Sequence, residues 1–352
     1  MGMFFRYISL IYLKNFFIIF FALLGFYCGV DLLLNAKDLP QSANTILLYV
    51  IFLAFGATGY ILPLSLVFAL SLSLLGMIRS GELVSLYALG LSKNKIALYP
   101  FLWALLFCLL YVGANFTPFA YANDYKSSIL KNGTLIKPGG EAFLKFNDVF
   151  VFIEKIENGQ NRVQNLKIFK IKEGALSTQI QAKEAEFKED FWVLEEGAIT
   201  QFSPRYEWNK AAPITLAFTQ MQTLRDFKPK IIENVANDSQ HSIKDAWQAL
   251  FLLKAQGLNV TALKISLYQL IFAPFFAPFL MLVMVHHFPV IARFFNLAFV
   301  GFVSFLVVLG LWGGLFLLTR LAQNGVLSGE LGILLPNFCL AATALWLFYR
   351  RK

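Results

Sequence analysis

The ionisable residues in the apolar parts of this sequence are few, and their types limit the chemistry that the chain can perform. His286 and His287 are adjacent, and their imidazoles could bind a metal ion or relay a proton. Anchoring at a membrane interface explains them better, because no acidic residue lies near them in sequence. Asp31 alone stands close to the inside of a long apolar segment. An ion-coupled carrier needs ionisable groups within its spans, so this pattern argues against one.

Nucleotide and metal chemistry would need motifs that the sequence does not contain. No Gly-x-x-x-x-Gly-Lys-Ser/Thr phosphate loop and no Ser/His/Asp arrangement is readable. The cysteines Cys28, Cys108 and Cys339 all fall in apolar runs, where they are small buried hydrophobes without metal-ligand spacing. We therefore predict a chain that is not catalytic by itself and holds no cofactor or metal.

Three basic residues, Lys37, Lys264 and Arg320, each lie beside the outer end of an apolar segment. Ammonium and guanidinium groups form strong charge-assisted hydrogen bonds to phosphate, so a cavity lined by them could hold a phosphate-bearing amphiphile. Alternatively, each side chain simply lays its apolar stem along the lipid and reaches the interface. The sequence leaves both explanations open.

The stretch from Arg79 to Lys95 predicts a short helix over residues 80–90 between two uncharged segments. Ser80 suits the N-cap, Glu82 the first turn and Gly90 a left-handed C-terminal turn. Its apolar stripe would consist of Leu83, Leu86, Tyr87 and Leu89. Such a helix lies along a bilayer surface and offers its polar side to a partner, or it merely connects two spans.

Composition places these residues in a membrane protein. The 352 residues are 58% hydrophobic, include 38 Phe and have a mean hydropathy of +0.62. Residues 119–263 hold 18 Lys+Arg and 17 Asp+Glu, so most of the net charge of +9 lies beside the membrane. This distribution argues against a nucleic-acid partner.

Six membrane spans are predicted. The second is the hardest to place, because Leu39–Ile78 is free of charge and is interrupted by Gly56, Gly59 and Pro63. We expect an interfacial or re-entrant first part followed by one crossing. The other spans are Phe16–Leu34, Ile96–Pro118, Ile265–Val285, Phe294–Leu318 and Leu331–Tyr349.

Lys and Arg set the orientation of these spans. With both termini in the cytoplasm, the inner loops and ends hold most of the basic residues, and the short outer loops hold only Lys37 and Arg320. Glu82 is then the one acid on the inner side. It could pair with a basic groove of a cytoplasmic partner, although stabilisation by the helix dipole alone would also explain it.

The outer segment changes to a strand-like pattern, which predicts a sandwich or jelly roll. Strands are expected at 149–153, 163–171, 178–187, 191–194 and 198–202, with turns at Asn158-Gly159, Gly174, Glu189-Asp190 and Glu196-Gly197. Ser242 to Asp245 is similar to a capping box and begins a helix whose stripe is Ile243, Ala246, Trp247, Leu250 and Leu253, ending at Gly257. The predicted domains are 1–118 with spans 1–3, 119–240 with the β-rich domain, 241–263 with the connecting helix, and 264–352 with spans 4–6.

Two Gly-x-x-x-Gly patterns, Gly25 to Gly29 and Gly310 to Gly314, fall in the first and fifth spans. They allow close approach of helices, either within this chain or at a seam between subunits.

As a whole, the chain resembles the lipopolysaccharide-export permease family of the LptF/LptG (YjgP/YjgQ) type. The resemblance rests on the opening Arg6 to Lys14, on Ile61 to Ser65, on Glu82-Leu-Val and Gly90-Leu-Ser-Lys93, and on three spans either side of a β-rich domain. Val30-Asp31 followed by Lys37 is similar to LptG, whereas the Pro63 region and Gly90 to Lys93 are similar to LptF. The paralogue is therefore left open.

The resemblance implies a fold and partners. The fold would have six transmembrane helices with a periplasmic β-jellyroll between the third and fourth. The chain would pair with a second six-span permease on a cytoplasmic LptB-like ATPase dimer, which binds ATP and Mg, and pass lipopolysaccharide from the inner membrane to LptC/LptA-like jellyroll bridge proteins. Glu82 matches the acid that contacts the ATPase, and the family's first and fifth spans line the cavity, which would put both glycine patterns at the partner seam. A membrane-anchored periplasmic scaffold without transport activity is the alternative.

Overall fold

The computed structural model describes two compact units. One comprises Met1–Lys126 with Thr261–Lys352, and the other Ser127–Val260. The described residues are 2–132, 142–146, 149–157, 162–172, 175–202, 213–225, 227, 242–255, 260–291, 293 and 295–350.

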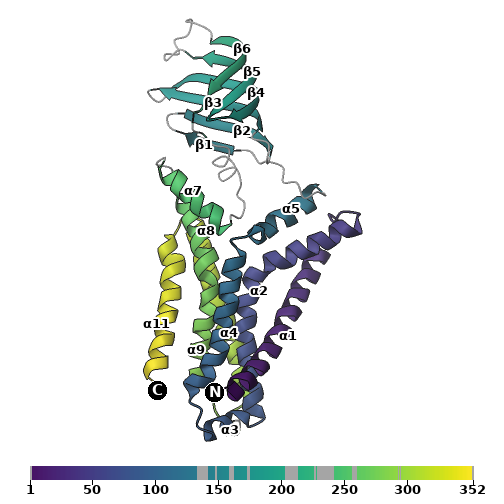
Figure 1. Cartoon of the computed structure of the whole chain (residues 1–352), viewed down its shortest axis with the longest axis vertical. Coiled ribbons are helices and arrows are strands. Elements are labelled where there is room, and N and C mark those ends of the chain that lie inside the picture. Colours follow the sequence, from purple (N-terminus) through teal and green to yellow (C-terminus); the bar gives the residue numbers. More distant parts are fainter. Residues whose placement is uncertain are drawn as a thin grey trace. The chain divides into compact units, whose positions relative to one another are not determined.

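The first unit is helical and contains six helices that are long and apolar enough to cross a membrane, as predicted (Figure 1). Three precede the strands in sequence: α1 (Gly2–Leu34), α2 (Ala43–Arg79) and α4 (Lys93–Ala114). The fourth runs through α8 (Thr261–Phe272), the 3-10 turn η2 (Ala273–Phe275) and α9 (Phe276–His287). α10 (Leu297–Gln323) and the π-helical turn η4 (Glu330–Leu334) with α11 (Leu335–Arg350) complete the set. The short helix α3 (Glu82–Ala88) joins α2 to α4.

The second span is helical from its start, so a re-entrant loop is wrong, whereas an interfacial first part followed by one crossing stays a prediction, because one crossing needs only about 20 residues. α2 is one helix of 37 residues that contains Pro63. The glycines are positions of close approach: a Cβ at Gly56 would overlap Asn123 Oδ1, and one at Gly59 would lie 2.7 Å from the Tyr111 hydroxyl. Glycine therefore serves packing here, since bilayer helices tolerate Gly and Pro where neighbours satisfy the backbone.

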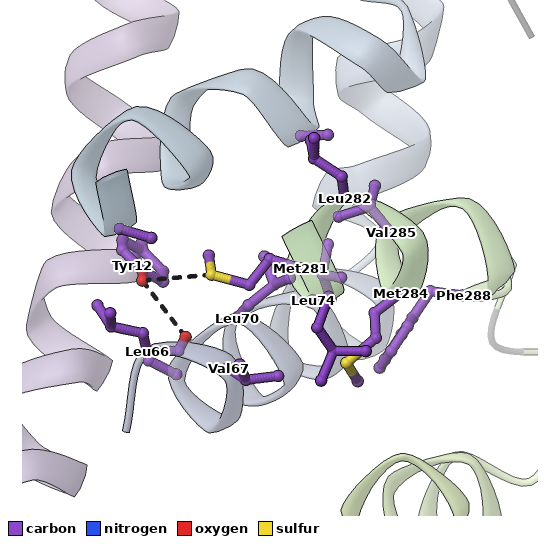
Figure 2. Packing of buried hydrophobic residues seen from close by; sticks show 14 of the residues in the cluster. Tyr12, Leu66, Val67, Leu70, Leu74, Met281, Leu282, Met284, Val285 and Phe288 are labelled. Atoms are coloured by element: carbon purple, nitrogen blue, oxygen red, sulfur yellow. Dashed lines mark hydrogen bonds between the residues drawn. The ribbon is translucent and has the colours of Figure 1, made fainter. Parts of the chain in front are cut away.

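α9 lies at the centre of the helical core, where it contacts α2, α4 and α11, while α2 also contacts α1 and α10. The Tyr12 side chain of α1 is completely buried in this core (Figure 2). Its hydroxyl donates to the Leu66 carbonyl at 3.3 Å and reaches Met281 Sδ at 3.8 Å. One polar atom thus ties α1 to α2 and α9.

The second unit contains a six-stranded antiparallel sheet in the order of the sequence, β1 to β6. The strands are β1 (Ala142–Phe146), β2 (Val149–Glu157), β3 (Arg162–Lys172), β4 (Ala175–Lys188), β5 (Phe191–Gln201) and β6 (Ile214–Thr223). Alternate residues build the buried face, including the fully buried Val151, Leu166, Ala182 and Trp192. Closure into a jellyroll stays a prediction.

Two strand assignments need correction. The segments predicted as 191–194 and 198–202 form the single strand β5, because its pairing with β4 and β6 keeps the same register on both sides of Glu196, although Glu196 has a φ of 49°. β1 and β6 were not predicted. The turn at Glu189-Asp190 is confirmed, whereas Asn158-Gly159 and Gly174 lie outside the described residues.

The order of elements also includes three shorter helical segments: η1 (Pro118–Tyr121), α5 (Ala122–Asn132) and α7 (Ile243–Ala255). Ser242 Oγ accepts from the Asp245 backbone N–H at 3.1 Å and donates to the Asp245 carboxylate at 2.7 Å, which confirms the predicted start of α7. Trp247 was placed on the buried stripe, but it is 54% exposed and Ala249 is buried in its place. Gly257 lies outside the described residues.

Candidate functional site

Helix α3 is shorter than predicted, and its start differs. Gly81, with φ of 75°, is the N-cap, and Ser80 instead ends α2, so the Ser80 cap was wrong. The C-terminal turn is as expected. The Gly90 N–H donates to the Tyr87 carbonyl and the Leu91 N–H to the Leu86 carbonyl, with Gly90 at φ of 83°. These two bonds form a Schellman motif, which only glycine adopts without strain.

One side of α3 is anchored in the helical core. Leu83 and Leu86 are 2% and 5% exposed, and Tyr87 is half-buried. A helix of seven residues is unstable alone, so these two leucines, worth about 1.5–3 kcal/mol each on burial, hold it in place. Burial raises the pKa of Tyr87 to about 12, so this side stays uncharged. Leu89 was placed on the stripe, but it is 66% exposed and Leu91 is buried instead.

The other side of α3 is exposed. Val84, Ser85, Ala88 and Leu89 are exposed. Glu82 is half-exposed, and its carboxylate interacts with the hydroxyl of Tyr7 on α1. The site therefore offers one carboxylate and a small apolar surface on a helix that is fixed to α1 and to the core.

Directly after α3, side chains in the first turn of α4 form hydrogen bonds with the ends of α9 and α11. Lys93 Nζ donates to the carbonyls of His286 and Phe288 at 3.2 and 3.3 Å. Asn94 Nδ2 donates to the Phe348 carbonyl of α11 at 2.7 Å, and Asn94 Oδ1 lies 3.0 Å from His286 Nε2. His286 is 3% exposed, so interface anchoring is wrong for it, while His287 is exposed. No pattern in the sequence predicted these contacts, because the residues that make them are far apart along the chain.

The three predicted phosphate contacts are all exposed, on three different segments: Lys37 after α1, Lys264 on α8 and Arg320 on α10. The Arg320 guanidinium donates to Gln323 Oε1 at 3.0 Å and lies 5.0 Å from the centre of the Phe316 ring. Within the described part of the chain, no hydrogen bond or ion pair joins the three to one another. Their binding of phosphate stays a prediction.

A fourth basic residue, Lys126, was missed. Its Nζ lies 2.7 Å from Asp31 Oδ2, and the two side chains are 20% and 15% exposed. The Asp31 carboxylate also accepts from the Tyr49 hydroxyl and, at 3.1 Å, from Asn35 Nδ2. An acidic residue near the end of an apolar helix is a sign that a basic side chain pairs with it. Nothing in the sequence indicated that this side chain would belong to α5.

Among the described residues, no other part of the chain packs closely against the two glycine patterns. A Cβ added to Gly25, Gly29, Gly310 or Gly314 would meet nothing within 4 Å. By contrast, a Cβ at Gly332 would lie 2.8 Å from the Cβ of Ala322. Packing among the described residues therefore does not account for the two patterns, and the subunit seam stays a prediction.

Among the described residues, no group of three or more His, Cys, Asp and Glu side chains is arranged to hold a metal ion.

No individually curated protein matches the sequence. The model of one family, described as lipopolysaccharide export system permease LptF/LptG, matches residues 6–350. That match spans both units, including the six apolar helices, α3 and the sheet. The chain is thus a multi-pass membrane protein that belongs to the lipopolysaccharide export system permease LptF/LptG family.

Proposed function

We propose that the chain is a permease subunit of an ATP-driven exporter, which extracts lipopolysaccharide from the inner membrane and passes it to a periplasmic bridge. The family match over residues 6–350 carries this proposal. The sequence has no phosphate loop, so the energy must come from a partner ATPase that binds ATP and Mg.

The ATPase docks on α3 in this proposal. Leu83, Leu86 and Tyr87 fix the helix to the spans, and Gly90 sets the turn by which it continues into α4. Glu82, with part of its surface open, supplies the charge that gives the contact its register. Movement of the ATPase then reaches the spans as a movement of α3. Both termini and α3 are cytoplasmic, in keeping with the distribution of Lys and Arg.

A second permease covers the glycine patterns of α1 and α10. Their open surfaces allow a partner backbone to approach Gly25, Gly29, Gly310 and Gly314 closely. Lipopolysaccharide occupies the cavity between the two permeases, where Lys37, Lys264 and Arg320 contact its phosphates. The sheet, closed as a jellyroll, passes the lipid to LptC/LptA-like bridge proteins.

The test is purification of the tagged full chain from its native membrane in mild detergent, with proteins and lipids identified by mass spectrometry. A P-loop ATPase, a second six-span permease and lipopolysaccharide are expected. Glu82→Lys should lose the ATPase and keep the second permease, whereas Glu184→Lys, the same charge change on an exposed residue of β4, should keep all three. Recovery of the chain without any ATPase, under conditions that preserve other transporter complexes, would overturn the proposal.

A further inference from the structure

Helix α7 carries a pair of exposed aromatic side chains. Trp247 is 54% exposed and Phe251 is 58% exposed. Their rings are in edge-to-face contact, with centroids 5.6 Å apart, so they form one continuous apolar surface. A different side of the helix faces inward, because Ile243, Ala246 and Ala249 are buried. The aromatic pair is therefore an apolar surface in addition to the one that α7 buries.

A lysine lies at each end of this aromatic pair. Lys244 precedes Trp247 by three residues, and Lys254 follows Phe251 by three residues. At about 100° per residue, the four positions fall within an arc of about 80° on one face of the helix. Both lysines are exposed, and among the residues that the structure describes no acidic side chain forms an ion pair with either. Their positive charge is thus available to an external group.

Aromatic rings between two lysines are typical of a helix that lies in a membrane interface. Trp and Phe rings bury apolar surface at the level of the lipid headgroups, while lysine stems lie along the apolar region and place their ammonium groups near phosphate. A protein partner fits this face less well, because lysine is depleted from protein–protein interfaces. α7 has 13 residues and is about 20 Å long, too short to cross a hydrocarbon core of about 30 Å.

The sequence keeps α7 close to the membrane. Residues 256–260 are all that separates Ala255, the last residue of α7, from Thr261, the first residue of the apolar helical segment Thr261–His287. Six residue steps span at most about 20 Å when fully extended. The C-terminal end of α7 is therefore within reach of the bilayer surface at which α8 begins.

We propose that the face of α7 formed by Lys244, Trp247, Phe251 and Lys254 docks on the phospholipid surface of the membrane. The two rings enter the headgroup region, and the two ammonium groups pair with lipid phosphates. α7 thereby anchors to the bilayer the part of the chain between β6 and α8. This inference goes beyond the proposed function, because it requires neither an ATPase nor lipopolysaccharide.

The first test measures the depth of α7 in a bilayer. In the full chain with Cys339→Ala, the remaining Cys28 and Cys108 are buried, so Phe251→Cys can be labelled with the fluorophore NBD. In vesicles of phosphatidylcholine and phosphatidylglycerol, a quencher attached near the headgroups should reduce its emission about twofold more than one near the bilayer centre. Leu102→Cys, on an exposed position near the middle of α4, is the matched control and should show the opposite preference. Emission from position 251 that neither quencher reduces, or that the deep quencher reduces more, would overturn the proposal.

The second test concerns the lysines. Lys244→Glu and Lys254→Glu, each introduced alone into the labelled chain, should lower the quenching near the headgroups by about twofold or more, because a carboxylate is repelled by anionic lipid. Lys170→Glu makes the same charge change on an exposed residue of β3 and should leave the quenching unaltered. Equal quenching in all three variants would contradict the proposal.

A third measurement identifies what covers the face in the native membrane. A photoreactive benzophenone amino acid in place of Trp247, in the otherwise unchanged full chain, should give adducts with phospholipid that mass spectrometry detects. Adducts with a protein and none with phospholipid would show that a protein partner occupies this face, and would overturn the proposal. Failure to recover an ATPase in the purification above would remove the proposed function and leave these three measurements unaffected.

Discussion

The ion pair between Asp31 and Lys126 tests how burial changes the free energy that an ion pair contributes to folding. The pair Lys183–Glu196 in the sheet has a similar N···O distance, 2.9 Å against 2.7 Å. Its side chains are 75% and 69% exposed, whereas those of Lys126 and Asp31 are 20% and 15% exposed. Distance is nearly constant between the two pairs, so a difference in their energies reflects the environment.

The two single variants of the buried pair should differ. Lys126→Met leaves the Asp31 carboxylate with its bonds from Tyr49 and Asn35, so we expect a loss of about 1 kcal/mol in the free energy of unfolding. Asp31→Leu leaves both the Lys126 ammonium and the Tyr49 hydroxyl without that acceptor. Removing one member of a fully buried pair costs about 3–5 kcal/mol, and the remaining exposure reduces this to about 2–3 kcal/mol.

The assay is denaturant unfolding of the single and double variants of each pair in the same detergent, read as a double-mutant cycle. The coupling energy should be about 1–2 kcal/mol for Asp31 and Lys126 and clearly smaller for the exposed pair Lys183 and Glu196, because solvent screens it. Equal couplings in the two pairs, or a larger loss for Lys126→Met than for Asp31→Leu, would refute the reasoning.

Four further changes test other parts of the structure. Glu82→Lys should weaken ATPase binding by about tenfold or more in a pull-down titration, with the unfolding midpoint unchanged; full binding would exclude the assigned role. Gly90→Ala should cost about 1–2 kcal/mol of unfolding free energy, because φ is 83°, and no loss would contradict the Schellman turn. Gly56→Ala should destabilise by about 1–3 kcal/mol in the same assay, and adding Asn123→Ala should recover most of it; the absence of recovery would place the clash elsewhere. Gly314→Leu should leave the unfolding of the purified chain unaltered and reduce co-purification of the second permease, and unchanged pairing would remove Gly314 from the seam.

Sequence patterns predicted correctly those elements whose structure depends on residues that are close together in the chain. Apolar length located the six spans, and the turn at Gly90 followed from the freedom of glycine at positive φ. The stripe on α3 was correct for Leu83 and Leu86 because they face the core at helical spacing. The predicted stripe is wrong at Leu89, because the Schellman turn redirects the chain and Leu91 reaches the core instead.

The remaining errors arose where distant residues decide the outcome. Glycines in α2 were interpreted as a break in the helix, but their role is set by Asn123 and Tyr111, which lie far along the chain. Likewise, Lys126 and Asn94 are unremarkable in sequence, and only the folded helices bring them to Asp31 and His286. In β5, the pair Glu196-Gly197 looks like a turn, yet pairing with β4 and β6 on both sides keeps the strand continuous.

The sequential order of the sheet has a consequence for how the protein is made. Among the described strands, each pairing from β1 to β6 joins consecutive strands, so each hairpin can form as soon as its second strand has been synthesised. The helical unit cannot close in this way, because contacts such as Cys108 Sγ to the Pro274 carbonyl join residues 166 positions apart. Synthesis of α1, α2 and α4 is therefore followed by a waiting period, during which the sheet forms and the first three helices lack their central neighbour α9. Assembly of the helical unit therefore finishes only when α9 has been synthesised and packs against α2 and α4.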